Sequence, residues 1–169
     1  RAITALQDKT RILRLMPAAT LIHPLLRTIR DISKDLNKQV EVEVLGEEVE
    51  VDRAVLNLLQ DPLTHLVRNA IDHGIESADV RSQAGKNAQG KIIIKVEHIG
   101  SQIVISVEDD GVGVDVNKVA EAAMRRRLLT KEERAKFSEQ ELLNLVFQPG
   151  VSTKEIITDY SGRGVGLDV

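Results

Sequence analysis

The sequence contains no cysteine and no tryptophan, and aromatic residues make up only 2% of its 169 positions. The absence of cysteine excludes disulfides and metal sites built on thiolates. The shortage of aromatic side chains leaves leucine, isoleucine and valine to fill the core. No apolar run approaches the roughly 18 to 20 residues that span a bilayer, and no basic-then-apolar signal segment stands at the N-terminus. We therefore expect a cytoplasmic protein with an aliphatic core and no direct insertion into a membrane.

A surplus of positive charge is also missing. Lysine and arginine number 23 against 26 aspartates and glutamates, which gives a formal net charge of −3. This balance is unlike that of nucleic-acid-binding proteins, so we expect no nucleic-acid partner. With 42% hydrophobic and 29% charged residues, the composition is typical of a folded globular domain. Because the chain begins at Arg1 and stops at Val169, where a helix would begin, we expect it to be a piece of a longer protein.

Hydrophobic periodicity predicts the helices. A spacing of three and four residues between apolar side chains, or a capping signal, marks residues 20–36, 52–74, 115–129 and 138–146. Within the second segment, Pro62 marks either a kink or the first position of a further helix. The last segment opens with Ser138 as a cap and Glu141 three residues later. Residues 1–18 read as a polar helical tail broken by Pro17, and residues 147–161, which lack a sustained period, as a candidate mobile loop.

Alternation of polar and apolar residues predicts the strands, over residues 40–44, 49–51, 91–97 and 102–109. The first two give two strands or a hairpin. The last two, joined across Gly100 and Ser101, predict an antiparallel hairpin at the centre of the sheet. The element order is not a regular alternation of strand and helix. We therefore expect an α+β fold, a two-layer α/β sandwich with a mixed sheet covered by helices on one face.

Glycines gather at two places, each beside a predicted helix start. Gly111 and Gly113 follow a strong strand, and the second cluster consists of Gly162, Gly164 and Gly166. Glycine lets a backbone approach a ligand closely, and free amides at a helix N-terminus attract phosphate. For either cluster alone, tight turns with no ligand are the alternative interpretation. The spacing is neither a dinucleotide-binding fingerprint nor a P-loop.

A polar stripe runs along the helix predicted over residues 52–74. Its members, on one helix face, are His65, Asn69, Asp72 and His73. The other side of the helix carries Leu66, Val67, Ala70 and Ile71. An asparagine amide oxygen is a hard ligand that suits Mg²⁺, and a histidine four residues earlier could position or deprotonate a group near a terminal phosphate. The alternative is a solvated helix face with two ordinary surface histidines.

Together these patterns resemble the GHKL superfamily of ATP-binding proteins, and closely resemble the ATP-binding catalytic domain of CheA-type chemotaxis histidine kinases. Residues 61–76 (DPLTHLVRNAIDHGIE) are similar to that family's N box and residues 107–115 (VEDDGVGVD) to its first glycine box. The segments LVFQPGVSTKE and SGRGVGLDV resemble its F box and second glycine box. The resemblance covers residues 20–169. It implies the Bergerat ATP-binding fold, truncated at the C-terminus because the family's domain continues with the rest of a helix and further strands.

The resemblance also implies roles for individual residues. It gives catalytic roles to His65, near the γ-phosphate, and to Asn69, the ligand of Mg²⁺, while Asp109 accepts a hydrogen bond from the adenine amino group. Gly111 and Gly113 shape the adenine pocket wall. The remaining residues expected to bind ATP are Asp72 and His73 in the N box, Ser152, Thr153 and Lys154 in the lid, and Gly162, Gly164 and Gly166 at the lid hinge.

The function that the resemblance implies is that of a two-component histidine kinase. Residues 19–169 would be its ATP-binding catalytic domain, and residues 1–18 a linker or the end of its dimerisation region. The γ-phosphoryl of ATP would pass to a histidine on a separate phosphotransfer domain and then to a response regulator. The full-length kinase would be dimeric and work with a receptor and a coupling protein.

Two alternatives stay open. GHKL hydrolases of the gyrase and Hsp90 kind use a glutamate four residues before the asparagine, where this chain has His65, and that difference favours a kinase. The other alternative is a non-catalytic nucleotide-binding signalling module.

The remaining histidines and an arginine run have ordinary interpretations. We expect His23 to be structural, and Arg125, Arg126 and Arg127 to form a solvated helix end. His98 has no partner at metal-ligand spacing.

Overall fold

The computed structural model describes residues 14–147. The chain divides into two compact units between Val112 and Gly113. Residues 1–13, most of the loop predicted over residues 147–161 and the second glycine cluster lie outside the described residues. Across the described part, no helix combines the length and the apolar character needed to cross a membrane.

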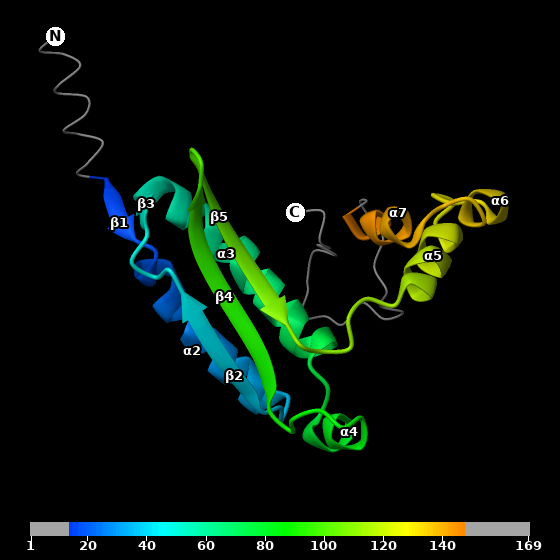
Figure 1. Ribbon diagram of the computed structural model, residues 1–169, viewed down its shortest axis with the longest axis horizontal. Helices are drawn as coiled ribbons and strands as arrows, with labels where there is room; N and C mark the ends of the chain where they lie inside the picture. The colour runs from blue at the N-terminus through cyan, green and yellow to red at the C-terminus, as the bar shows by residue number, and fades with distance from the viewer. Residues whose placement is uncertain (1–13, 148–169) are drawn as a thin grey trace, which may run out of the picture. The chain divides into compact units, whose positions relative to one another are not determined.

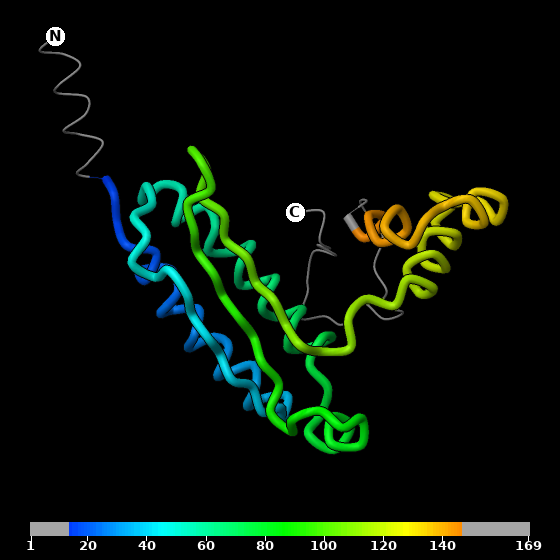
Figure 2. Tube along the Cα trace, viewed as in Figure 1, coloured from blue at the N-terminus to red at the C-terminus, as the bar shows by residue number. Residues whose placement is uncertain are grey.

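The first unit is built on a mixed three-stranded sheet. Its strands are β2 (Val40–Leu45), β4 (Gly90–Ile99) and β5 (Gln102–Asp109), in the order β2-β4-β5. Strand β2 runs parallel to β4, and β5 runs antiparallel to β4, as the tube in Figure 2 shows. The predicted β4–β5 hairpin is therefore confirmed, with Gly100 at φ +62° in its turn. Only β4 is central, however, because β5 has one partner in the described sheet.

Two long helices cover one face of this sheet. Helices α2 (Ala19–Asp35) and α3 (Arg53–Asn69) lie side by side against it (Figure 1). Their apolar stripes and the inward side chains of β4 form one core, which includes Ile22, Ile29, Leu63, Val67, Ile92 and Ile94. On the other face the sheet carries charge, for instance the 2.6 Å ion pair between Lys91 and Glu43. The predicted α+β sandwich with a mixed sheet and helices on one face is confirmed.

A small second sheet corrects the prediction for the N-terminal segment. Strand β1 (Leu15–Pro17) pairs antiparallel with β3 (Glu50–Asp52), so these three residues are not helical. Strand β3 does not form a hairpin with β2 either, because β2 pairs with β4 instead. Val51, opposite Met16, is completely buried. Segments of three residues carry too little periodicity to reveal a long-range partner, and burial of Val51 decides this pairing.

Helix α3 runs without interruption through Pro62, so of the two alternatives at that residue, a kink or a further helix start, the structure excludes the helix start. The helix begins after Asp52, whose carboxylate accepts a hydrogen bond of 2.8 Å from the Ala54 amide. Proline removes a single helical hydrogen bond, and the buried positions of α3 on both sides of it hold the helix against the core.

The last five residues of the helix predicted over residues 52–74 form a π-helical turn, η1 (Ala70–Gly74). A short helix that sequence patterns did not reveal, α4 (Ala78–Gln83), follows.

The second unit, from Gly113 onward, contains α5 (Val116–Arg125), α6 (Lys131–Arg134), α7 (Glu139–Asn144) and the 3₁₀ turn η2 (Leu145–Phe147). Helix α5 ends earlier than predicted, and Arg127 has a positive φ of 59° just beyond it. The predicted Ser138 cap is confirmed, since its side chain and that of Glu141 form a capping box. The described core of this unit consists of two small clusters: Ala120, Ala123, Leu129 and Leu142 in one, and Val119 and Ala122 in the other. Arg125, Arg126 and Arg127 are exposed, as expected of a solvated helix end.

Candidate functional site

The polar stripe of the N-box segment lies at the end of α3 and on the π-helical turn. His65 and Asn69 are half-buried on α3, while on η1 Asp72 is half-buried and His73 exposed. The His73 Nε2 and Asp72 Oδ2 atoms are 3.2 Å apart. A uniform α-helix predicted one continuous face, but the wider π turn changes the rotation of the last two residues relative to the first two.

Burial on the other side of this segment follows the prediction with one exception. Val67, Ala70 and Ile71 are buried, whereas Leu66 is 41% exposed. The apolar side is therefore narrower than the sequence suggests. Because three of the four residues are held in the core, the backbone that carries His65 and Asn69 is anchored.

A lysine that sequence patterns did not reveal donates hydrogen bonds to the π-helical turn. Lys38, between α2 and β2, donates through Nζ to the carbonyl oxygens of Ile71 (2.7 Å) and Asp72 (2.9 Å). These carbonyls belong to the turn that ends the helix, where backbone acceptors lack helical partners. Burial lowers the pKa of Lys38, against the opposing effect of the carboxylates of Asp72 and Glu76. Lys38 thus holds the turn that presents Asp72 and His73.

The end of the N-box segment meets the first glycine box. Strand β5 ends at Asp109 next to η1, as Figure 1 shows for the C-terminal ends of α3 and β5. A Cβ atom at Gly74 would lie 2.7 Å from Asp109 Oδ1, and one at Gly111 would overlap the carbonyl group of Gly74. The Val112 amide donates to the Gly74 carbonyl oxygen over 3.0 Å. Two of the three sequence patterns are therefore adjacent in space, and glycine permits the close approach.

This contact orients the carboxylate of Asp109. Its Oδ1 atom accepts a hydrogen bond of 3.0 Å from the Gly111 amide, and the residue is exposed. An ionised carboxylate has about four acceptor positions, so one amide leaves capacity for a further donor. A ligand that offers an N–H group, such as the amino group of a purine, suits this acceptor.

The Gly74–Gly111 contact gives a testable prediction. Gly111→Ala should destabilise the protein by about 1–3 kcal/mol, because the added methyl group meets backbone rather than a flexible side chain. Gly100→Ala is the control: its φ is positive but the space around it is open, so we expect a loss of about 1 kcal/mol. Urea denaturation measures both variants. Equal losses would show that steric contact at Gly111 contributes nothing.

An ion cluster with a buried centre contacts the residues of the first glycine box. Arg81, on α4, is 1% exposed and makes ion pairs with Glu76 (2.9 Å) and Asp110 (2.7 Å). Lys86 contacts the other oxygen of Glu76 at 2.8 Å. The bond from Lys86 is the main cause that lowers the pKa of Glu76. The pKa of Asp110 is also lowered: burial opposes this, but the Lys91 amide and Arg81 outweigh it.

The lowered pKa values predict acid sensitivity. In the acid range the unfolded chain binds protons at Glu76 and Asp110 that the folded protein does not, so stability rises with pH there. This contribution is present above the ordinary carboxyl pKa and is lost as the pH falls below about 4. We expect the urea midpoint of Glu76→Gln to change less between pH 6 and pH 3 than that of the wild type. The exposed residue Glu48, changed to glutamine, should leave the wild-type dependence intact.

Sequence reasoning missed Lys38, Glu76, Arg81, Lys86 and Asp110. The available signals were weak: a doubled aspartate before the glycines, and charged residues scattered between η1 and β4. Such side chains read as solvated unless the fold is known, because burial of a charge depends on distant partners.

Other predicted site residues are not assigned a contact here. Gly113 has a φ of +72°, and a Cβ atom at this position would meet no atom within 4 Å. The lid residues Ser152, Thr153 and Lys154 and the hinge residues Gly162, Gly164 and Gly166 lie outside the described residues. Within residues 14–147, no three His, Asp or Glu side chains come together as a metal site.

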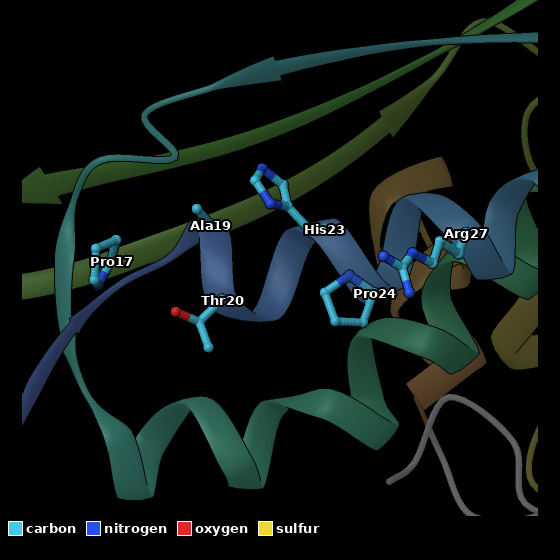
Figure 3. Close-up of a pocket in the computed structure, with 6 residues that line it drawn as sticks. All are labelled: Pro17, Ala19, Thr20, His23, Pro24 and Arg27. Atoms are coloured by element: carbon cyan, nitrogen blue, oxygen red, sulfur yellow. The ribbon is translucent and has the colours of Figure 1, made fainter.

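A surface hollow elsewhere contains none of the predicted site residues. It has a volume of about 350 Å³ and lies around the first turns of α2 (Figure 3), lined by Pro17, Ala19, Thr20, His23, Pro24 and Arg27. His23, which we expected to be structural, is exposed there, and its Nε2 lies 3.2 Å from Glu47 Oε2. His98 is also exposed.

Residues 55–169 match the family described as histidine kinase-, DNA gyrase B-, and HSP90-like ATPase. The chain is 44% identical over 157 residues to the chemotaxis protein CheA of Bacillus subtilis, covering 93% of this chain and 23% of that protein. It is 44% identical over 172 residues to the chemotaxis protein CheA of Borreliella burgdorferi, covering 100% and 19%.

A relative with a different name is the gliding motility regulatory protein of Myxococcus xanthus, 41% identical over 156 residues, which cover 92% of this chain and 20% of that protein. The chain thus spans about a fifth of the length of these relatives.

Proposed function

Because the chain belongs to the histidine kinase-, DNA gyrase B-, and HSP90-like ATPase family, as a CheA-type ATP-binding domain, we propose that it supplies the catalytic centre of a protein histidine kinase. In this reaction the γ-phosphoryl group of ATP passes to a histidine imidazole on a separate phosphotransfer domain. The ATP-binding character follows from the family; the phosphoryl acceptor, the metal and the individual residue roles are parts of the proposal.

The observation that carries the proposal is that Gly74 packs against Asp109 and Gly111, which are joined by a hydrogen bond from the Gly111 amide to Asp109 Oδ1. It brings an oriented, exposed carboxylate to the end of the segment that bears His65 and Asn69. Because a carboxylate can accept but cannot donate, it can bind the 6-amino group of adenine but not the carbonyl oxygen that guanine carries at the same position. Asp109 is therefore the residue that we propose to recognise the base.

The residues present also suit a magnesium–triphosphate group. Asn69 offers an amide oxygen, a hard ligand, from a half-buried position on a rigid helix. A single protein ligand fits Mg²⁺, which usually keeps several waters and binds the phosphates of its nucleotide. When bound, the ion would neutralise charge that develops on the transferring phosphoryl group. Asn69 would hold and orient the magnesium ion. His65, one turn earlier, would lie near the terminal phosphate.

His65 also separates the kinase from the second candidate function, a hydrolase of the gyrase or Hsp90 kind. A glutamate at this position can take a proton from water as a general base. This chain has His65 at that position instead, and the difference favours a kinase over a hydrolase. We therefore rank histidine phosphorylation above hydrolysis, and a non-catalytic binding module below both.

The test uses the complete protein with radiolabelled ATP, Mg²⁺ and a histidine-containing phosphotransfer domain. The proposal predicts label on that domain which is stable in base and labile in acid, as expected of phosphohistidine. Release of inorganic phosphate with no labelled protein would support the hydrolase. Tight nucleotide binding with neither product would support the non-catalytic module.

The wider assembly is part of the same proposal. A response regulator that takes the phosphoryl group, a dimeric full-length kinase, a receptor and a coupling protein are the partners proposed, supported by the relatives named CheA. The cytoplasmic location and the division into residues 1–18 and 19–169 stay predictions.

A further inference from the structure

We propose that Arg81 and Lys86 are positioning residues that hold the turn after β5 and thereby set the selectivity of Asp109 for the amino group of adenine. This inference rests on the proposed function. Neither residue needs to touch the nucleotide; both would act through the backbone of residues 110–112.

The first step is the hydrogen bonding of Arg81. Its guanidinium group donates to four residues in three chain segments, and all of its N–H groups have an acceptor at 3.5 Å or less. Its acceptors are the carboxylates of Glu76 and Asp110 and the carbonyl oxygens of Asn87, Gln89 and Asp110. Arginine presents these donors in a rigid plane, so it fixes the relative places of the segments that it joins.

The second step is the bonding of Lys86. Its Nζ donates to the carbonyl oxygens of Asp110 (3.0 Å) and Gly111 (2.9 Å) and to Glu76 Oε1 (2.8 Å). An ammonium group has three donors, so all three are used. Two successive peptide units of the glycine box are thus held from the same side, and the following amide, that of Val112, is held by Gly74.

The third step links this frame to Asp109. The Asp110 carboxylate also accepts from the Lys91 amide at 2.8 Å, which fixes the turn to the start of β4. With the peptide units of residues 110 and 111 fixed, the Gly111 amide has one direction in which to donate, and Asp109 Oδ1 accepts it. A hydrogen-bond acceptor that is held in place discriminates between ligands with and without the matching donor. An acceptor that is misplaced gains little binding energy from that donor, so it discriminates less.

The experiment compares ATP with purine riboside triphosphate, which lacks the 6-amino group, by titration calorimetry on the complete protein. The measured quantity is the ratio of the two dissociation constants. We expect Lys86→Met to reduce the preference for ATP roughly three- to tenfold while the affinity for the analogue changes less than about twofold. Lys86 is 35% exposed, so its replacement should be tolerated. Arg81→Lys keeps the charge but not the planar set of donors, and it should also reduce the preference for ATP.

Two controls decide the interpretation. Lys95→Met, which removes an ion pair on the outer face of β4, should leave the ratio unchanged. In an Asp109→Asn background, Lys86→Met should cause no further loss of preference. An equal loss of affinity for both nucleotides in Lys86→Met and Arg81→Lys would overturn the inference and leave the proposed function standing. Failure of the wild-type protein to bind either nucleotide would overturn the proposed function itself.

Discussion

Asn69→Ala should reduce phosphoryl transfer to histidine by at least about 100-fold, because the substitution removes the proposed amide ligand of Mg²⁺. Asn69 lies half-buried on α3 immediately before the π-helical turn, so its side chain is held by a helix that is anchored in the core. Alanine favours the helical conformation, and the fold should therefore survive. The initial rate of phosphohistidine formation at saturating ATP and Mg²⁺ measures the effect.

Asn57→Ala is the matched control for this variant. Asn57 lies on the same helix and is exposed, so its replacement should change neither rate nor stability appreciably. Circular dichroism and a urea midpoint would show that Asn69→Ala remains folded. A folded Asn69→Ala protein with a wild-type rate would exclude Asn69 from the metal site.

Arg81→Met should lower the free energy of unfolding by about 3–5 kcal/mol, because it removes a buried charge that is paired with two carboxylates. The substitution leaves the carboxylate of Glu76, only 6% exposed, with a single remaining cationic partner, Lys86. It also leaves carbonyl oxygens of the loop before β4 without the donors that Arg81 provides. Methionine keeps most of the volume, so the loss reports charge and hydrogen bonding rather than a cavity.

Urea denaturation near neutral pH measures this change, and Arg30→Met provides the control. Arg30 is exposed on α2, and we expect its replacement to change the free energy of unfolding by no more than about 0.5 kcal/mol. A similarly small effect of Arg81→Met would mean that the cluster is not needed for the stability of the first unit.

Local patterns predicted the large elements well. Helix α2 and the hairpin of β4 and β5 appear where the periodicity placed them, because burial of one face imposes a repeat on the side chains. At Pro62 the sequence left a kink and a further helix start open, and the structure excluded the helix start, since a helix packed on a core tolerates a proline that a local rule treats as a boundary. Strand β1 was missed because three residues hold no repeat to read.

For the candidate site, the sequence by itself determined which residue types are available and in which order: the amide and imidazole of one helix, and a carboxylate followed by glycines after a strand. These features are local, and a helix or strand displays them wherever it lies. Only the tertiary structure decided that Gly74 meets Asp109 and Gly111, that β2 pairs with β4, and that Arg81 is buried between two carboxylates. Such contacts join residues far apart in the chain, and their energies depend on burial and partners that no local pattern contains.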